Sequence, residues 1–382
     1  MSKSTCHTGT SVLFVVDHLD TGGAPVVVRD LIKGMHQAGA QVTLVVLSER
    51  VSHELLEGVA LVTLPLAMNT RAERRQRYAR HAALLNDWLS GWLSDRQEGQ
   101  TSGFNLVVAH LHHAHQVVSR SCLASTAWYC LHTDPVVELL GNKRGLGRWL
   151  KQRKVQALYG DRRVLAVSQG ILDSMASRLR IRMARQVAVH NPIDMARIRE
   201  LAAERIDDVP PDYLVFVGRI NQRQKRFDRL FDAYRDSGVQ LPLVVVGAGG
   251  DLPAVKAMAE SRGVADRVHF LGSRTNPYPY MQHARALLLS SDYEGFALVL
   301  AEALALGTPT ISVDCPSGPA EILCEGLADC IVPLDDDAAF ARTIQWAVEH
   351  PPRVPTEICD RFRLATVVER YLALAEPHSE QR

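Results

Sequence analysis

The sequence predicts an α/β protein made of two doubly wound domains, each with a parallel sheet covered by helices on both faces. Three observations support this prediction. The chain has 382 residues, more than one ordinary hydrophobic core contains. Nearly continuous Val- and Leu-rich runs alternate with amphipathic segments, as in buried parallel strands joined by helices. The alternation stops at Asn191-Pro192 and then begins afresh, which indicates a domain boundary there.

The first half contains five expected strands. The run 11–19 is followed by the pair Gly22-Gly23 and by an expected helix over 24–40, with Pro25 near its first turn. The remaining apolar runs of this half are short and are each bounded by polar segments, as buried strands are. These expected strands are 41–48, 105–111, 127–133 and 163–169.

The second half repeats the pattern, with expected helices over 226–238 and 296–307. Its expected strands are 213–220, 241–250, 267–273, 284–291 and 308–314. The restart of the pattern divides the chain, and two such sheets in one chain are expected to leave a cleft between the domains. The expected parts are an N-terminal domain over 1–192, a C-terminal domain over 193–355 and a C-terminal helix within 356–382 that packs back on the N-terminal domain.

Composition excludes several classes of protein. A hydrophobic fraction of 47% and a charged fraction of 22% are typical of globular proteins, and no apolar run is long enough to span a membrane. The N-terminus has no signal-peptide layout, and the seven scattered cysteines form no CxxC pair, so we expect a cytoplasmic protein with reduced thiols. Basic residues are in excess before Pro192 and acidic residues after it. The basic half either attracts an anionic surface or ligand or only balances the acidic half.

The loops after the strands are the candidate binding segments, because open α/β sheets bind ligands at the carboxyl ends of their strands. After the first strand, Gly22 and Gly23 allow a tight turn, and the next helix offers free N–H groups to an anion. An ordinary strand-to-helix turn is the alternative. The absence of GxGxxG after this strand disfavours an NAD-dependent oxidoreductase.

A basic loop follows the first strand of the second half. Arg219 lies at the strand end, and Lys225 lies six residues later, just before the next helix. Arg223 and Arg226 add to the local charge. A diphosphate needs cationic partners near a helix N-terminus, so we interpret the loop as a phosphate site. A solvated basic loop is the alternative.

Two glutamates bracket an apolar segment near the end of the second sheet. Glu294 precedes the helix 296–307 and Glu302 lies near its middle, so their positions are about 12 Å apart along the axis. That is too far for an acid/base pair acting on one bond, which needs about 5–10 Å. The spacing instead suits the two ends of one long ligand, with the loop 271–281 gripping a base. Helix-dipole and exposed-charge explanations stay open, although a charge among these apolar neighbours needs a partner.

These motifs together resemble a known family. The stretch "EGFALVLAE" is similar to the E-x7-E motif of retaining glycosyltransferases of glycosyltransferase family 4, which have the GT-B fold of two facing Rossmann-like domains. The "GRI…QK" loop resembles the family's diphosphate-binding pair, and "NPYPYM" and "DCPSGPAEIL" resemble members that build bacterial lipopolysaccharide core, O-antigen or capsule. The resemblance implies a hexosyltransferase that uses a nucleotide-sugar, UDP-hexose by preference, with retention, and without a metal or cofactor.

The resemblance also assigns roles to residues. Arg219 and Lys225 would neutralise the donor diphosphate, Glu302 would hold the ribose, and Glu294 would hold the donor sugar together with the backbone amides of Gly295 and Phe296. The implied catalytic set is Glu294, Arg219, Lys225 and His132, and the implied donor-binding set is Gly22, Gly23, Arg219, Lys225, Gly295, Phe296 and Glu302.

Two positions depart from the family pattern. Proline is usual where Ala297 stands, and we expect this difference to affect the start of the helix little. An acid is frequent after the glycine pair, where this chain has Ala24-Pro25, which leaves the acceptor side undefined.

Histidines gather after two strands of the first half. His110, His112, His113 and His115 follow one strand and His132 follows the next. We expect His112, His113 and His132 to line the acceptor site, where an imidazole can orient a sugar hydroxyl. Structural histidines are the main alternative, and a metal is not expected because no cysteine or carboxylate lies within the run.

Two basic segments, 70–81 and 142–155, predict an anionic partner for the first half. The second also carries Leu146, Trp149 and Leu150, a composition suited to the inner surface of a membrane. A solvated cationic face or a surface for acceptor phosphates is the alternative. Nucleic acid is not expected, because no binding motif is present.

The preferred function is thus transfer of a hexose to a glycan or glycolipid acceptor. The alternatives are another enzyme of this architecture, such as a nucleotide-sugar epimerase or phosphorylase, and a non-catalytic sugar-binding or assembly subunit. We expect Glu294→Ala or Lys225→Ala to abolish transfer while leaving the melting temperature nearly unchanged.

Overall fold

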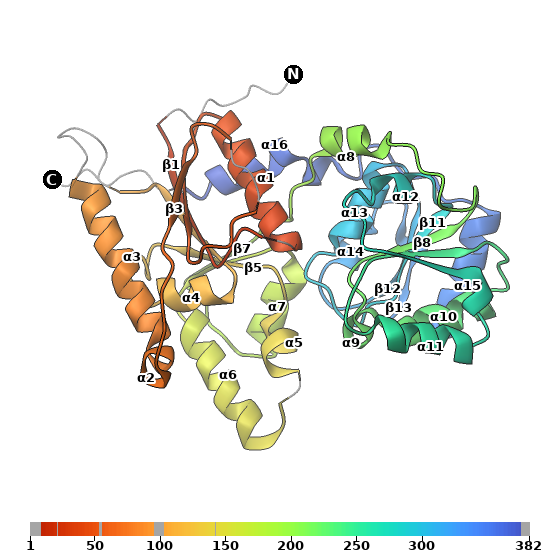
Figure 1. The fold of residues 1–382 in the computed structure, drawn as a ribbon, viewed down its shortest axis with the longest axis horizontal. Helices are drawn as coiled ribbons and strands as arrows, with labels where there is room; N and C mark the ends of the chain where they lie inside the picture. Colours follow the sequence, from red (N-terminus) through yellow and green to blue (C-terminus); the bar gives the residue numbers. More distant parts are fainter. Residues whose placement is uncertain (1–8, 21, 53–55, 95–102, 142, 376–382) are drawn as a thin grey trace. The chain divides into compact units, whose positions relative to one another are not determined.

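The chain folds into two compact units in the computed structural model, which describes residues 9–20, 22–52, 56–94, 103–141 and 143–375 (Figure 1). The first unit is Met1–Pro192 together with Leu364–Arg382, and the second is Ile193–Arg363. The second unit therefore extends beyond residue 355, where the sequence pattern predicts its end. The last seven residues of the expected C-terminal segment, 376–382, lie outside the described residues.

The first unit is built on a seven-stranded parallel sheet in the order β3-β2-β1-β4-β5-β6-β7. All six residues of the central strand β1 are buried, as its continuous apolar run predicts. The strands are β1 Ser11–Val16, β2 Gln41–Val46, β3 Ala60–Thr63, β4 Leu106–His110, β5 Trp128–Leu131, β6 Arg163–Ala166 and β7 Arg185–Ala188. The helices are α1 Gly23–Gln37, α2 Arg71–Arg75, α3 Arg77–Ser94, α4 His112–Val118, α5 Pro135–Leu140, α6 Gly145–Tyr159, α7 Gln169–Ser177 and α16 Leu364–Leu372.

The C-terminal helix α16 packs against α1, as Figure 1 shows. The contact depends on Gly34 of α1, where an added Cβ would lie only 2.7 Å from the Cγ2 atom of Val368. A side chain at this position would push α16 away from α1. The last described helix of the chain thus completes the core of the first unit.

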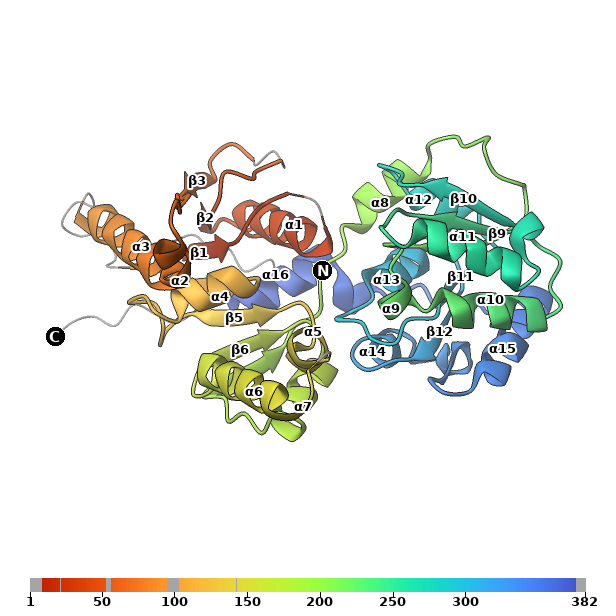
Figure 2. The same ribbon diagram turned by 60° about the horizontal axis from the view of Figure 1, so that its bottom comes forward.

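The second unit is built on a six-stranded parallel sheet in the order β10-β9-β8-β11-β12-β13 (Figure 2). The strands are β8 Leu214–Val217, β9 Leu243–Val246, β10 Val268–Gly272, β11 Ala286–Leu289, β12 Thr310–Asp314 and β13 Ile331–Pro333. The helices are α8 Met195–Ala202, α9 Gln222–Lys225, α10 Phe227–Asp236, α11 Leu252–Ser261, α12 Tyr278–Gln282, α13 Leu298–Ala305, α14 Pro319–Ile322 and α15 Asp337–Glu349. No helix within the described ranges combines the length and the apolar character needed to cross a bilayer.

Each sheet has one point at which the strand order reverses. This switch point lies between β1 and β4 in the first unit and between β8 and β11 in the second. Chains leaving the two strands at a switch point diverge, so a crevice opens at the carboxyl edge. The segments after β1 and β4, and those after β8 and β11, are therefore where each unit is expected to bind ligands.

Glycines after β9 let two loops of the second unit run against each other. A Cβ added to Gly249 would lie 1.9 Å from the carbonyl oxygen of Ile220, whereas one added to Gly250 would meet no atom within 4 Å. The backbone N–H of Ile220 donates to the carbonyl of Ala248 at 2.9 Å, which fixes this close approach. The glycines thus hold the loop after β8 at the sheet edge.

Replacing Gly249 by alanine is expected to destabilise the protein by about 1–3 kcal/mol, because the new methyl group must displace backbone. Gly250→Ala is the matched control and should change stability by less than about 0.5 kcal/mol. Urea unfolding of both variants measures the difference. Equal stability of the two variants would show that the approach of the two loops is not tight.

Candidate functional site

The second unit places Lys225 and Glu294 in direct contact at its switch point. Lys225 ends α9, which follows β8, and Glu294 lies in the loop that follows β11. The Lys225 Nζ atom lies 2.6 Å from Glu294 Oε1, and Ser291 Oγ donates to the same oxygen at 2.6 Å. Lys225 and Glu294 are each only 8% exposed. Within the described chain the other carboxylate oxygen of Glu294 has no hydrogen bond, so it can accept one from a ligand.

A ladder of hydrogen bonds joins α9 to the loop that carries Glu294. The Asp292 N–H donates to the Gln224 carbonyl at 2.8 Å, and the Gln224 side chain donates to the Tyr293 carbonyl at 3.2 Å. The buried hydroxyl of Ser290 donates to the Lys225 carbonyl at 2.6 Å. The backbone around the Lys225–Glu294 pair is therefore held from both sides before any ligand binds.

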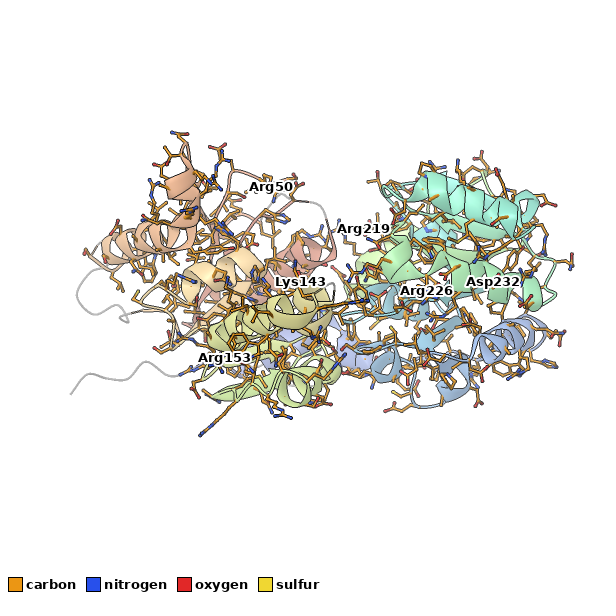
Figure 3. All side chains as sticks on the ribbon, turned by 90° about the horizontal axis from the view of Figure 1, so that it is seen from below. Arg50, Lys143, Arg153, Arg219, Arg226 and Asp232 are labelled. Atoms are coloured by element: carbon orange, nitrogen blue, oxygen red, sulfur yellow. The ribbon has the colours of Figure 1, made fainter. Side chains whose placement is uncertain are left out.

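The four basic residues of the predicted phosphate site differ in their contacts with other side chains. Arg226 is engaged, since its guanidinium bonds Asp228 at 2.9 Å and Asp292 at 2.9 and 3.0 Å. Arg226 thus lies in the loop of the predicted phosphate site with its charge already paired to two carboxylates. Arg219 and Arg223 are exposed and make no hydrogen bond or ion pair with other described residues. Figure 3 shows Arg219 apart from Arg226.

Arg229 is a structural residue that the sequence analysis missed. It lies in the first turn of α10 and is 6% exposed. Its Nη1 atom donates to the Ser290 carbonyl and to Asp292 at 2.9 Å each. Arg229 therefore anchors the start of the loop that leads to Glu294. Its role could have been predicted from the sequence, because an arginine on the apolar face of an amphipathic helix is buried and a buried charge requires partners.

Gly295 and Phe296 connect Glu294 to α13 in a tightly packed turn. Phe296 is buried and packs edge-on against Phe362, with ring centroids 5.1 Å apart. A Cβ added to Gly318 would lie 2.9 Å from the Phe296 backbone, so the loop after β12 presses on this turn. The peptide groups predicted to hold a donor sugar thus lie in a rigid segment.

Ala297 starts α13 in a left-handed conformation, with φ 54° and ψ 55°, and no side chain caps the helix. Proline has φ fixed near −65° and cannot adopt this conformation. The expectation that the exchange of alanine and proline matters little at the start of this helix is therefore wrong for this chain. The uncapped N–H groups of α13 remain available to an anionic ligand.

Glu302 contacts the loop 271–281, which is the segment predicted to contact a base. It is half-buried in α13, and the hydroxyl of Tyr278 lies 3.4 Å from its Oε1 atom. Tyr278 begins α12 and belongs to the sequence "NPYPYM". The structure therefore brings Glu302 together with the loop 271–281, and their role in holding a nucleoside stays a prediction.

The first unit places Gly22 at the N-terminus of α1 with φ 121°, a conformation that favours glycine. No side chain caps the 15-residue helix. Its first N–H groups therefore lack a side-chain acceptor, and the anion site expected at Gly22 and Gly23 stays a prediction.

A pocket of about 240 Å³ lies at the carboxyl edge of the first sheet. It contains two of the predicted acceptor residues, His112 and His132, together with the acidic Glu138. The Thr133 hydroxyl donates to Glu138 and fixes this carboxylate on the pocket wall. Its lining residues are Ala24, Leu111, His112, His115, Cys130, Leu131, His132, Thr133, Pro135, Glu138, Leu139 and Tyr159.

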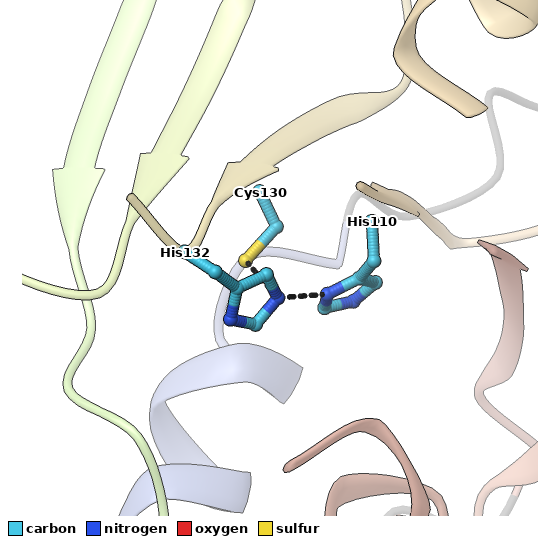
Figure 4. A group of neighbouring side chains, drawn as sticks. All are labelled: His110, Cys130 and His132. Carbon is cyan, nitrogen blue, oxygen red and sulfur yellow. Dashed lines mark hydrogen bonds between the residues drawn. The ribbon is translucent and has the colours of Figure 1, made fainter. Parts of the chain in front are cut away.

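His110, Cys130 and His132 lie close enough to ligate a metal ion (Figure 4). His110 Nδ1 is 2.9 Å from His132 Nε2, which is 3.7 Å from Cys130 Sγ. Two imidazoles and a thiolate suit zinc or copper. Metal-binding histidines ordinarily bond a second partner through their other nitrogen. The His110 Nε2 atom is buried and has no partner within the described chain, so the arrangement is better described as a hydrogen-bonded histidine pair.

His113 and His115 have structural partners instead. His113 Nε2 is 2.9 Å from His81 Nδ1, and His81 bonds the Leu64 carbonyl through its other nitrogen. His115 bonds the Tyr159 hydroxyl at 3.0 Å and a backbone carbonyl at 3.0 Å. Within the described chain, the structure therefore separates His113 from the pocket that His112 and His132 share.

Asp17 is a second residue that the sequence analysis did not single out. Its carboxylate accepts the N–H groups of His113 at 3.0 Å and Ala114 at 2.5 Å, in the first turn of α4. Burial raises the pKa of Asp17 to about 6. The carboxylate joins the segments after β1 and β4 at the switch point. Its position directly after the first apolar run could have indicated a site residue, because loops after strands bind ligands in such sheets.

The buried histidines predict that acid destabilises the protein. Burial lowers the pKa of His113 and of His132 to about 4, and that of His115 to about 3. Below pH 6.5 the unfolded chain binds protons that the folded chain does not, so stability falls as pH falls. Each group contributes about 1.4 kcal/mol per pH unit between its two pKa values. Urea unfolding at pH 7 and pH 5 should show this loss, and equal stability at the two pH values would contradict it.

Two family models together match most of the chain. Residues 21–197 match Glycosyltransferase Family 4, and residues 199–363 match Glycosyl transferases group 1. The two halves of the chain belong to these glycosyltransferase families. The two parallel sheets and the structural likenesses described next confirm the predicted GT-B fold class.

Named relatives agree with the family. Lipopolysaccharide 1,6-galactosyltransferase of Salmonella typhimurium is 34% identical over 168 residues, which cover 43% of this chain and 46% of the relative. The chain thus matches about half the length of this curated relative. The apo structure of the lipopolysaccharide outer core galactosyltransferase WaaB has a TM-score of 0.69 at 19% identity, covering 96% of this chain and 99% of that one. HepE of Anabaena, in complex with UDP and glucose, has a TM-score of 0.69 at 17% identity, covering 95% and 98%.

Proposed function

We propose that this protein transfers a hexose from a nucleotide-sugar to a glycan or glycolipid acceptor in the synthesis of bacterial cell-surface polysaccharide. The observation that carries the proposal is the buried Lys225–Glu294 pair at the switch point of the second sheet. Arg219, which has no hydrogen bond or ion pair with other described residues, lies after strand β8, in the segment that also contains Lys225. Arg219 and Lys225, as cations for a diphosphate, and Glu294, as a carboxylate for a sugar, thus lie at the sheet edge where open α/β sheets bind ligands. The similarity to a lipopolysaccharide galactosyltransferase also supports the proposal of hexose transfer.

Each residue has a proposed role in binding the donor. Arg219, Lys225 and the uncapped start of α13 hold the diphosphate. The free oxygen of Glu294 accepts a hydrogen bond from a sugar hydroxyl, and Glu302 with Tyr278 holds the ribose. Gly22 and Gly23 at the start of α1 supply further N–H groups for the diphosphate or the acceptor.

The proposed chemistry retains the configuration at the anomeric carbon. The bond from this carbon to the diphosphate oxygen breaks, and a bond to the acceptor oxygen forms on the same face. The acceptor proton passes to the leaving phosphate, so no side-chain nucleophile takes part. The protein acts by positioning the reactants and by stabilising charge on the leaving group and the sugar. No metal or cofactor enters this scheme.

The acceptor is proposed to lie in the pocket that His112 and His132 share. Burial lowers the pKa of His132 to about 4, so its imidazole is neutral at pH 7. A neutral imidazole can accept a hydrogen bond from the acceptor hydroxyl and orient it for attack.

UDP-hexose is the proposed donor, since the HepE neighbour is in complex with UDP and glucose and the curated relative transfers galactose. A thermal-shift screen against UDP-, GDP- and ADP-sugars tests this, followed by NMR of the anomeric proton in the product. Stabilisation by a UDP-hexose and an unchanged anomeric configuration are expected. Stabilisation by none of these sugars, or inversion, would contradict the proposal.

We also propose that α6 rests on the cytoplasmic face of the membrane. Leu146 and Trp149 are 72% and 54% exposed, and Arg153, which is labelled in Figure 3, lies over the Trp149 ring at 5.7 Å. Apolar side chains beside arginines bind anionic lipid surfaces. Trp149→Glu is expected to reduce sedimentation with phosphatidylglycerol vesicles at least about threefold. The exposed Trp346→Glu in the second unit is the control, and equal losses would contradict a specific contact through α6.

A further inference from the structure

A second pocket of the first unit, about 580 Å³ in volume, carries an unusual concentration of positive charge. Five of its lining residues are lysine or arginine, and none is aspartate or glutamate. These five residues come from α3, the segment after α4, α6 and the segment before β6. The lining residues are Arg77, Tyr78, His112, Gln116, Ser119, Arg120, Lys151, Lys154, Val155, Ala157, Leu158 and Arg162.

No carboxylate neutralises these charges among the residues that the structure describes. Arg77 donates to the Tyr78 hydroxyl, Arg120 to the Gln116 carbonyl and Arg162 to the Ala124 carbonyl, which are all uncharged acceptors. The Arg162 Nε atom is buried and has no partner in the part of the chain that the structure describes. The charges therefore repel one another across a concave surface unless an anion binds between them.

Two lysines of α6 remain unengaged in the same wall. Lys151 and Lys154 make no hydrogen bond or ion pair with other described residues. The arginines opposite them are held in place, because Arg77 and Arg120 lie over the Tyr78 ring at 4.3 and 5.4 Å. A site that combines guanidinium groups held by contacts with ammonium groups that are not hydrogen-bonded to described residues suits phosphate oxygens, which accept several charge-assisted hydrogen bonds.

We propose that this pocket binds phosphoryl groups carried by the acceptor, as a phosphorylated glycan or a polyprenyl diphosphate. The inference rests on the proposed transfer reaction. His112 lines both this pocket and the smaller pocket of His132, so the two cavities adjoin. An acceptor sugar in the smaller pocket would thus place a neighbouring phosphate among the five cations. The donor diphosphate has cations of its own, Arg219 and Lys225, in the second unit.

The test measures binding of inorganic pyrophosphate by calorimetry to protein already saturated with UDP, so that the donor site is filled. Wild-type protein is expected to bind pyrophosphate, and Lys151→Gln/Lys154→Gln to bind it at least about tenfold more weakly. Lys256→Gln/Arg342→Gln removes the same charge from exposed positions in the second unit and should bind as wild type does. No binding to wild type, or equal weakening in both variants, would overturn the proposal.

Competition identifies the source of the phosphate. Displacement of pyrophosphate by a phosphorylated oligosaccharide, or by phosphatidylcholine vesicles that contain polyprenyl diphosphate, supports an acceptor site and names its chemistry. Displacement by phosphatidylglycerol vesicles alone would overturn it in favour of a headgroup site. Failure of the transferase assignment is distinguishable, because UDP would then fail to bind while pyrophosphate still bound to the pocket.

Discussion

Replacing Glu294 by glutamine is expected to lower the rate of sugar transfer by about 10²–10³-fold. The amide oxygen still accepts hydrogen bonds from Lys225 and Ser291, so the turn before α13 keeps its shape. The negative charge that faces the donor sugar is lost. Steady-state kinetics at saturating donor should therefore show the loss in kcat, with little change in the melting temperature.

A matched control separates this effect from a general change of charge. Glu349→Gln removes one negative charge from an exposed position at the end of α15 and should retain full activity. A Glu294→Gln variant with activity within about twofold of wild type would contradict the role of the carboxylate.

Lys225→Ala is expected to destabilise the protein by about 3 kcal/mol as well as to abolish transfer. Removing the ammonium leaves the Glu294 carboxylate buried with only the Ser291 hydroxyl as a hydrogen-bond donor to its side chain among the described residues. Because the two groups are buried partners, we now expect alanine at either position to lower the melting temperature, in place of the nearly unchanged value expected from the sequence.

A double-mutant cycle tests this reasoning. Lys225→Ala/Glu294→Ala removes both charges, so its loss of stability should be smaller than the sum of the two single losses by about 1–3 kcal/mol. Urea unfolding at pH 7 gives the three values. Strict additivity would show that the lysine and the carboxylate do not interact in solution.

The fold was predictable wherever a strand is buried on both faces. Strand β9 has only apolar residues, and β1 has only apolar residues after Ser11, so the sequence pattern alone locates them. The edge strands β3 and β7 were missed, because their residues are mostly exposed and form no continuous apolar run. Continuous apolar runs, which reflect burial, therefore predicted the strands, whereas strand propensity did not.

The candidate site was predictable as a set of residues but not as a set of contacts. Lys225 and Glu294 both follow strands at a sheet edge, and this made their proximity a reasonable expectation. Their ion pair, and the engagement of Arg226 by Asp292, join positions 69 and 66 residues apart in the sequence. Sequence spacing carries no information on which of several nearby cations meets such a carboxylate.

A crystal structure of the protein with UDP bound would show directly whether the donor binds at the Lys225–Glu294 pair. We expect the diphosphate to contact Arg219, Lys225 and the start of α13, with the ribose beside Glu302. A nucleotide bound elsewhere, with the Lys225–Glu294 pair untouched, would contradict this expectation.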